Sequence, residues 1–191
     1  SMPDLGNALS ISHDYMKQWI QPGDAVIDAT VGNGKDTVFL AGLVGETGKV
    51  YGFDVQQMAL DRAAEKLSAA GLRERAELFC DGHQNMERHV LQKVRFVDFN
   101  LGYLPAGDKA VTTLVKTTLP AVEAALRLLL PGGMCSICVY PGHEEGEREL
   151  QALLSLLREL DEREYTVVYR AFWNQKKRPP ELFAIVKNFQ K

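Results

Sequence analysis

The sequence predicts an α/β fold with a doubly wound, mostly parallel sheet of seven strands that ends in an antiparallel hairpin. From about residue 25 onward, short apolar runs alternate with helical patterns, which is typical of a parallel sheet covered by helices on both faces. A glycine-rich turn follows the first of these runs. The last two runs, 165–173 and 182–187, are joined by a loop too short for a parallel crossover, so they must pair antiparallel.

Each element follows from a local pattern. Residues 7–20 have a helical apolar spacing that Pro22-Gly23 stops, and later helices are ended by Gly45, Gly71 and Pro131-Gly132-Gly133. The other expected helices cover residues 35–44, 57–70, 84–91 (a weak pattern), 116–130 and 144–160. The expected parallel strands cover residues 25–29, 50–54, 76–80, 94–100 and 134–140.

Length and composition fit one cytoplasmic domain over residues 1–191. Of the 191 residues 46% are hydrophobic and 25% charged, near the average for a globular protein, and Ser1 before Met2 is interpreted as a tag remnant. No apolar run reaches about 18 residues and no basic start precedes an apolar stretch, so neither a membrane span nor a secretory signal is expected. The net charge of −3 argues against broad nucleic-acid binding but leaves room for a local basic patch.

The three cysteines do not predict a metal site. Cys135 and Cys138 form a lone C-x-x-C within an apolar strand, where residues three apart lie on opposite faces. No second pair completes a zinc site. We therefore expect buried free thiols and no metal.

The turn after the first strand predicts a cofactor site. Asp28 ends the strand, and Gly32 and Gly34 allow a tight turn and close approach of a ligand to the backbone before a helix begins. A dinucleotide fingerprint needs a third glycine where this chain has Thr37. An acidic strand end with a glycine-rich turn instead suits S-adenosylmethionine, whose amino-acid tail is cationic. An ordinary strand-to-helix turn is the alternative.

Two further strand ends favour a nucleoside ligand. Asp54 ends the second strand 20 residues after Gly34, where a carboxylate can accept hydrogen bonds from both ribose hydroxyls. Asp81-Gly82-His83 ends the third strand, where it can reach the adenine edge. For Asp81, capping of the following helix is an equally good explanation.

The end of the fourth strand predicts the chemical site, because strands one and four flank the point where the strand order reverses. Asn100-x-x-Tyr103 resembles the N-P-P-Y motif of amine-directed methyltransferases. There the asparagine oxygen accepts a hydrogen bond from an amine and the tyrosine stacks on a planar base. Asp98, His143 and Glu144 are candidate proton acceptors. A turn asparagine and a packing tyrosine are the alternative.

The expected hairpin tip, 173–180, combines an aromatic residue, amides and cations, a composition that suits RNA loops. The residues concerned are Trp173, Asn174, Lys176, Lys177 and Arg178. By composition alone, such a basic stretch is more often a solvated loop than a binding site.

Several motifs together resemble one family. They are D-A-T-V-G-N-G-K-D-T (28–37), F-D-V-Q (53–56), F-N-L-G-Y-L-P-A-G-D-K (99–109), Y-P-G-H-E-E-G (140–146) and N-Q-K-K-R-P-P (174–180). They are similar to the small bacterial "putative rRNA methylase" family, also called the YtqB or MnmM family. The resemblance implies a Rossmann-like class I methyltransferase fold and S-adenosylmethionine as cofactor. It also implies methylation of the amine of 5-aminomethyl-2-thiouridine at the tRNA wobble position.

The resemblance and the strand ends together give the expected site residues. Catalytic roles are expected for Asn100 and Tyr103. The expected cofactor contacts are Asp28, Gly32, Asn33, Gly34, Asp36, Asp54, Gln56, Asp81, Gly82, His83 and Asn100. The expected contacts to a tRNA anticodon loop are Lys109, His143, Asn174, Lys176, Lys177 and Arg178. Monomer and homodimer both remain open.

Four positions depart from the family pattern. Gly82 stands where serine is expected, Ala106 where glycine is usual, and Asp98 in a normally apolar stretch, while 114–116 lacks the usual polar run. Three other functions remain. They are methylation of rRNA or another amine, nucleoside binding without catalysis, and nicotinamide oxidoreduction, which Thr37 disfavours.

Overall fold

Helices and strands follow one another in the predicted alternation. The computed structural model describes residues 3–102 and 113–189. The strands are β1 (Ala25–Asp28), β2 (Lys49–Asp54), β3 (Ala76–Cys80), β4 (Val94–Asn100), β5 (Leu129–Val139), β6 (Tyr165–Arg170) and β7 (Glu181–Lys187). The helices are α1 (Ala8–Trp19), α2 (Lys35–Val44), α3 (Gln57–Ala69), α4 (Met86–His89), α5 (Val115–Leu128) and α6 (Glu144–Arg158), with short 3-10 helices η1 (Arg73–Arg75) and η2 (His83–Asn85).

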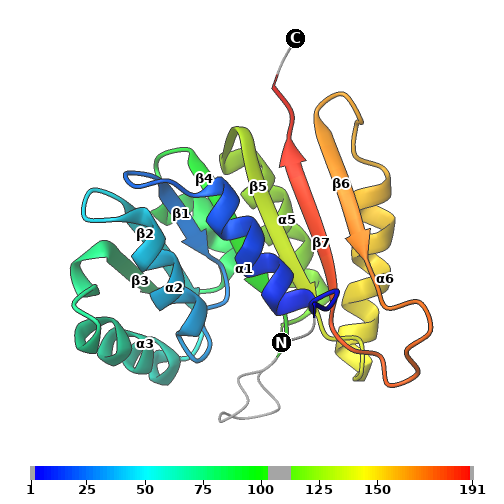
Figure 1. Cartoon of the computed structure of the whole chain (residues 1–191), viewed down its shortest axis with the longest axis horizontal. Coiled ribbons are helices and arrows are strands. Elements are labelled where there is room, and N and C mark those ends of the chain that lie inside the picture. The colour runs from blue at the N-terminus through cyan, green and yellow to red at the C-terminus, as the bar shows by residue number, and fades with distance from the viewer. Residues whose placement is uncertain (1–2, 103–112, 190–191) are drawn as a thin grey trace.

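The strands form one seven-stranded sheet in the order β3-β2-β1-β4-β5-β7-β6 (Figure 1). Strands β1 to β5 pair in parallel, whereas β7 pairs antiparallel with both β5 and β6. The predicted doubly wound sheet with its terminal antiparallel hairpin is therefore confirmed. The order reverses between β1 and β4, as expected for the strands that flank the ligand site.

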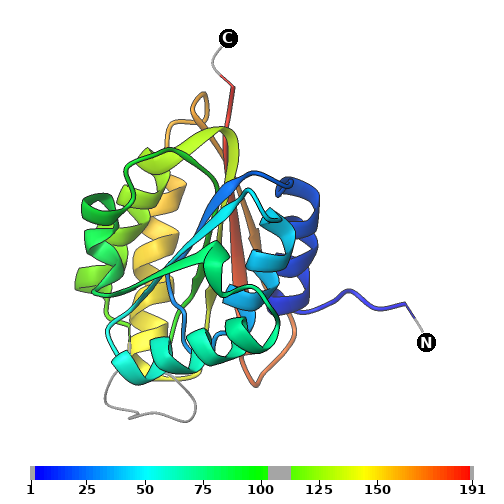
Figure 2. The same cartoon turned by 90° about the vertical axis from the view of Figure 1, so that its left-hand side faces the viewer.

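Helices cover both faces of the sheet (Figure 2). The blue α1 and cyan α2 lie on one face, and α5 and α6 lie on the other. Side chains of a strand alternate between the faces, so Val97 and Phe99 of β4 join the core under α5 and α6, while Phe96 packs under α1 and α2. By the same alternation Asp98 and Asn100 project toward the α1 and α2 face.

One predicted boundary is wrong. Pro131-Gly132-Gly133 was expected to end a helix, but α5 stops at Leu128 and β5 already begins at Leu129. Leu129 pairs with Val94, and the next pair is Met134 with Phe96, so four residues of β5 face the single Arg95 of β4 and form a bulge within the strand. A Cβ at Gly133 would lie 2.9 Å from the carbonyl oxygen of Arg95, which explains the glycine.

Two smaller differences concern local pairing. The weak helix expected at 84–91 is a short η2 followed by the four-residue α4. The strand expected to reach Trp173 ends at Arg170, because cross-strand pairing with β7 stops at Leu182. Cys135 and Cys138 are buried free thiols as predicted, and burial raises the pKa of both. Among the described helices, none has the length and apolar character needed to cross a bilayer.

Candidate functional site

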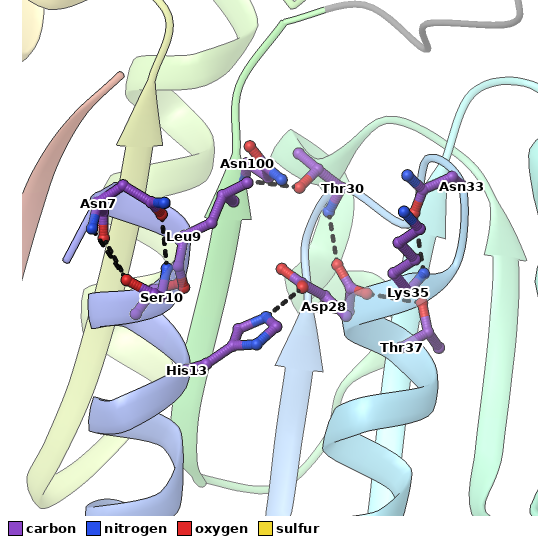
Figure 3. A network of polar contacts seen from close by, with 12 residues as sticks. Asn7, Leu9, Ser10, His13, Asp28, Thr30, Asn33, Lys35, Thr37 and Asn100 are labelled. Atoms are coloured by element: carbon purple, nitrogen blue, oxygen red, sulfur yellow. Dashed lines mark hydrogen bonds and ion pairs between the residues drawn. The ribbon is translucent and has the colours of Figure 1, made fainter. Parts of the chain in front are cut away.

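The candidate site lies at the carboxyl edge of β1 and β4, where the predicted strand ends meet. Asp28 of β1 and Asp98 of β4 are register partners, and Asn100 ends β4 two residues after Asp98. Figure 3 shows Asn100 beside Thr30, with the first turn of α1 facing both. The backbone N–H of Asn100 donates to Thr30 Oγ1 at 2.7 Å, which joins the end of β4 to the loop after β1.

The two glycines of this loop, Gly32 and Gly34, are required for different structural reasons. Both have a positive φ, 54° at Gly32 and 83° at Gly34, which side chains disfavour. A Cβ on Gly34 would lie 2.9 Å from the Cα of Ala63, so glycine is needed there for α2 to pack against α3. Gly32 is half-buried at the loop surface and donates its N–H to Asp54 Oδ2 at 2.9 Å. Of the two, Gly32 is therefore the better placed to approach a ligand.

Asp54 is held by two backbone amides. Its Oδ2 accepts from Gly32 and its Oδ1 from the N–H of Gln56 at 2.9 Å. Each carboxylate oxygen has a second lone pair, so both remain able to accept a hydroxyl. Gln56 is the half-buried N-cap residue of α3. Asp54 is thus oriented at the end of β2 before any ligand arrives, which fits the predicted ribose contact.

Asn33 lies at the exposed apex of the loop. Its side-chain oxygen accepts from the N–H of Lys35 at 2.9 Å, and its carbonyl oxygen accepts from Lys66 Nζ. The side-chain bond satisfies one of the free amides at the start of α2. These contacts hold the apex in place, and the predicted cofactor contact of Asn33 stays a prediction.

Asp28 lies behind the loop and is completely buried. Thr37 Oγ1 donates to its Oδ2 at 2.7 Å and the Thr30 N–H to its Oδ1 at 3.2 Å. Burial, followed by the charge of Asp36, raises its pKa from 3.8 to about 7 against the effect of these hydrogen bonds. In this structure Asp28 therefore shapes the loop from behind rather than presenting an oxygen at the surface.

Asp36 forms the exposed end of a buried carboxyl cluster. His13 Nε2 of α1 lies 2.7 Å from Asp36 Oδ1, and Figure 3 shows His13 pointing from α1 toward the end of β1. Burial opposes ionisation of Asp36, but its hydrogen bonds with His13 and Asp98 together outweigh burial and lower its pKa. The cluster thus presents an ionised carboxylate next to Thr37 and Gly34, where a cationic amino-acid tail could be bound.

Asp98 of β4 is the third carboxyl of the cluster. Its Oδ2 is buried and has no hydrogen-bond donor among the described residues. Burial, then the charge and hydrogen bond of Asp36, raise the pKa of Asp98 well above its ordinary value. A protonated Asp98 that donates to Asp36 satisfies both carboxyls. Because Asp98 is buried and its pKa is raised, it is a poor candidate for the proton acceptor of a reaction.

The cluster makes stability depend on pH. Because the pKa of Asp28 is raised to about 7 in the folded state, its contribution to stability is present below pH 3.8 and is lost as the pH rises toward 7. We expect the free energy of unfolding of Asp28→Asn, relative to wild type, to increase over that interval. Urea unfolding at several pH values measures this difference, with Asp14→Asn on the exposed side of α1 as the control.

The difference in free energy of unfolding between wild type and Asp28→Asn removes the contributions of other titrating groups. Burial lowers the pKa of His83 to about 4, so His83 alone makes the folded protein more stable as the pH rises from 4. This opposing contribution is the same in wild type and in Asp28→Asn. Parallel stability curves for the two proteins would contradict the protonated state of Asp28.

The third strand end is built largely from internal contacts. Asp81 accepts from the Gly82 N–H at 2.8 Å, from Asn85 Nδ2 at 2.9 Å and from His89 Nε2 at 2.9 Å. His83 is buried, and its Nδ1 faces the carbonyl oxygen of Ala29 at 3.2 Å. These bonds tie Asp81 to the segment that follows it, and Asp81 and Gly82 are both half-buried.

Asn100 has an unsatisfied acceptor at the predicted position. Its Oδ1 is buried and has no hydrogen-bond partner among the residues described. Burial raises the pKa of the neighbouring Tyr140 to about 12, although a hydrogen bond with the Asn100 side chain lowers it. A buried amide oxygen without a donor is costly, so it is a strong acceptor for the N–H of a ligand.

The other predicted residues divide into two groups. His143 is the N-cap of α6 and its ring accepts from the Gly146 N–H at 3.3 Å, while Glu144 pairs with Arg148 at 2.7 Å. Both contacts favour the helix-capping explanation of this segment. Asn174, Lys176 and Lys177 are exposed, whereas Arg178 pairs with Glu147 Oε2 at 3.0 Å. Tyr103, Ala106 and Lys109 lie outside the described residues.

Glu149 connects α6 to the chain just beyond Asn100. Its buried carboxylate accepts from Thr113 Oγ1 at 2.9 Å and from Thr118 Oγ1 at 2.6 Å. Thr113 in turn accepts from the Gly102 N–H at 2.9 Å through its hydroxyl and donates its own N–H to the Gly102 carbonyl oxygen at 3.0 Å. Glu149 thus fixes Gly102, two residues after Asn100, to the scaffold.

Three further residues contribute to the site without having been predicted from the sequence: His13, Thr30 and Tyr140. Each belongs to a motif or helix that was identified, but its role arises from a contact with a distant strand. For Thr30 and Tyr140 the only local signal is a position within two residues of the end of a parallel strand. For His13 there was no local signal.

Comparison with known proteins places the chain in a family. The family described as "Putative rRNA methylase" matches residues 50–186. The chain belongs to this family. Membership in the rRNA methylase family agrees with the motifs at 28–37, 99–109 and 174–180.

Solved structures extend the likeness over nearly the whole chain. An rRNA-methylase of Clostridium thermocellum described as "putative" is 43% identical, with a TM-score of 0.95 over 97% of this chain and 100% of that one. A methyltransferase of Streptococcus mutans, also described as "putative" and solved in complex with SAH, is 38% identical, with a TM-score of 0.88 over 96% of this chain and 99% of the other. The rRNA methylase family therefore shares the class I methyltransferase fold seen here.

A curated relative names a substrate. The chloroplastic tRNA (mnm(5)s(2)U34)-methyltransferase of Arabidopsis thaliana is 43% identical over 156 residues, which are 76% of this chain. The chain spans 57% of the length of that relative.

Proposed function

We propose that this chain is an S-adenosylmethionine-dependent tRNA methyltransferase. The substrate is the amine of 5-aminomethyl-2-thiouridine at the tRNA wobble position, and the product is 5-methylaminomethyl-2-thiouridine. Family membership and the name of the Arabidopsis relative support the reaction class and the substrate. The observation that supports it most directly is the buried, unpartnered Oδ1 of Asn100 at the end of β4.

The residues present fit the cofactor. Asp54 has lone pairs left for two ribose hydroxyls, Gly32 brings backbone to the loop surface, and the ionised Asp36 offers a counter-charge for an ammonium group. Gly82 lies half-buried at the end of β3, where an adenine edge would be read. When bound, S-adenosylmethionine supplies an electrophilic methyl group on a sulfonium.

The chain's own contribution to chemistry is mainly orientation. The Asn100 Oδ1 accepts an N–H of the substrate amine, which leaves the nitrogen lone pair free to point at the methyl group. The amine must be neutral to attack and loses one proton over the reaction. Because Asp98 is buried and its pKa is raised, Glu144 pairs with Arg148 and His143 caps α6, we assign this proton to water.

A second candidate is an N-methyltransferase that acts on rRNA or on another amine. The description of the matching family favours this alternative. Both candidates use the same cofactor residues and Asn100, so only the substrate distinguishes them. We further propose that residues 1–191 form one methyltransferase domain that acts in the cytoplasm on the anticodon loop.

A substrate comparison tests the proposal. Labelled S-adenosylmethionine is offered with tRNA that contains 5-aminomethyl-2-thiouridine, with the same tRNA unmodified, and with rRNA. We expect label only in the first, because only that substrate has an alkylamine lone pair at the wobble base. Mass spectrometry of the digested nucleosides should show methylaminomethyl-2-thiouridine. Equal label in both tRNAs, or label in rRNA alone, would refute the wobble-uridine assignment.

A further inference from the structure

Exposed apolar side chains gather where α1 begins and where β6 connects to β7. Trp173 is fully exposed, Leu5 is 89% exposed, and Tyr169 is 43% exposed. Figure 1 shows the start of α1 and the β6–β7 connection at the same edge of the sheet, toward which β1 points. Large apolar side chains that cluster on a surface mark interaction sites more often than isolated ones do.

A pocket of about 350 Å³ lies within this cluster. Ala8 and Ile11 of α1 form one side, and Tyr169, Phe172 and Leu182 form the other. A neighbouring hollow of about 230 Å³ shares Tyr169 and Phe172 and reaches Trp173 and Arg178. The larger pocket has the size of a small-ligand site.

Tyr169 forms a fixed aromatic wall between the two hollows. Its ring stacks on Phe183 with centroids 4.8 Å apart and an interplanar angle of 17°. Its hydroxyl donates to the Glu181 carboxylate. These two contacts already hold the Tyr169 ring in one orientation. The ring therefore loses little conformational entropy when a planar group packs against its other face.

The pocket lies close to the candidate active site. Ala8 and Leu182 belong to one apolar cluster with Cys138, against which Tyr140 also packs. Cys138 is the register partner of Asn100 on the neighbouring strand. A group bound in the pocket is therefore separated from Asn100 by one strand and the Tyr140 side chain.

Cations border the aromatic wall. Arg170 lines the pocket and donates from Nε to Tyr15 Oη at 3.3 Å. Lys176 and Lys177 are exposed, and neither forms an ion pair with any residue that the structure describes. Arg178 has a φ of 53° and is already paired with Glu147. Aromatic surfaces with free cations at their border suit unpaired bases and their phosphates.

We propose that this pocket binds an unpaired nucleobase of the substrate RNA, next to the nucleotide that is presented to Asn100. The proposal rests on the proposed RNA methyltransferase function and adds a second base-binding site to it. Phe172 and the open face of Tyr169 contact the base, while Lys176 and Lys177 contact the flanking phosphates. A second copy of the chain fits less well, since a two-fold contact through this patch would bring like charges of both copies together.

The experiment measures binding of an anticodon stem-loop oligonucleotide to the full chain. We expect Phe172→Leu, which keeps an apolar side chain but removes the ring, to raise the dissociation constant by about 5-fold to about 100-fold. Phe172→Tyr keeps the ring and should bind within about twofold of wild type. Leu91→Ala removes an exposed apolar side chain at the opposite edge of the sheet and should bind like wild type.

Salt dependence separates base contacts from phosphate contacts. Changing Lys176 and Lys177 together to alanine should reduce the slope of log affinity against log salt by about two. Phe172→Leu should leave that slope unchanged, because no phosphate contact is lost. Trp173 fluorescence should be quenched by the oligonucleotide, and Trp173→Phe should abolish that change while Trp19, bonded to the Gly132 carbonyl, remains.

Two results would overturn the proposal. One is wild-type RNA affinity in Phe172→Leu. The other is a concentration-dependent dimer that Phe172→Leu disrupts, which would make the patch an interface between copies. If wild-type protein still methylates 5-aminomethyl-2-thiouridine tRNA in either case, the proposed function stands and only the base pocket is lost.

Discussion

Replacing Asn100 by alanine is expected to lower the rate of methyl transfer by about 100-fold or more, with cofactor affinity changed only a few-fold. The reason is that Oδ1 of Asn100 is a buried acceptor without an internal partner, so its hydrogen bond is available to the substrate amine. Single-turnover methylation measures the rate, and calorimetry with S-adenosylhomocysteine measures cofactor affinity.

Asn100→Ala should affect catalysis far more than folding stability. Asn100→Ala removes an acceptor oxygen that has no partner, which costs little folding free energy, together with one hydrogen bond to Tyr140, so its melting temperature should fall by no more than a few degrees. Asn100→Asp keeps an acceptor oxygen and should retain more activity than Asn100→Ala. Near-normal turnover in the alanine variant would remove the amine-orienting role from Asn100.

Replacing Asp54 by alanine is expected to weaken cofactor binding by about 2 to 3 kcal/mol, which corresponds to about 30-fold to 150-fold in affinity. Asp54 is the carboxylate that the loop amides of Gly32 and Gln56 orient at the end of β2. Calorimetry with S-adenosylhomocysteine measures the loss, and NAD should bind wild type far more weakly than that ligand does.

The amide bonds of Asp54 call for matched controls. Asp54→Asn keeps one oxygen for the loop and loses the charge, so its affinity should lie between those of wild type and Asp54→Ala. Glu77→Ala removes an exposed carboxylate of β3 that pairs with Lys49 at 3.1 Å and should not change affinity. Equal cofactor affinity in wild type and Asp54→Ala would place Asp54 outside the site.

Most of the scaffold could be predicted from the sequence because its signals are local. Apolar runs and helical spacing predicted all seven strands and the flanking helices, since burial of one face imposes its period on the residues. The short link between the last two strands required the antiparallel hairpin. The positions of Asp54 and Asn100 followed from strand ends alone, because ligands lie beyond the carboxyl edge of such a sheet.

Pairing between distant segments decided the rest. In the sequence, Gly132 and Gly133 look like the end of a helix. In the structure Leu129 already pairs with Val94, so β5 begins before these glycines. Arg178 looks like a free cation next to Lys176 and Lys177, but α6 places Glu147 beside it. His143 was predicted as an RNA contact, and the structure adds that it is also the N-cap of α6.

The polar cluster at the ends of β1 and β4 was likewise predicted only in part from the sequence. By itself the sequence determined that Asp28 ends a strand and that Asp36 begins a helix, because both positions are fixed by local backbone preferences. Only the tertiary structure decided that Asp98 lies between them and that His13 reaches Asp36 from α1. The raised pKa of Asp98 follows from that packing, since the ionisation of a buried carboxyl depends on neighbours that are remote in sequence.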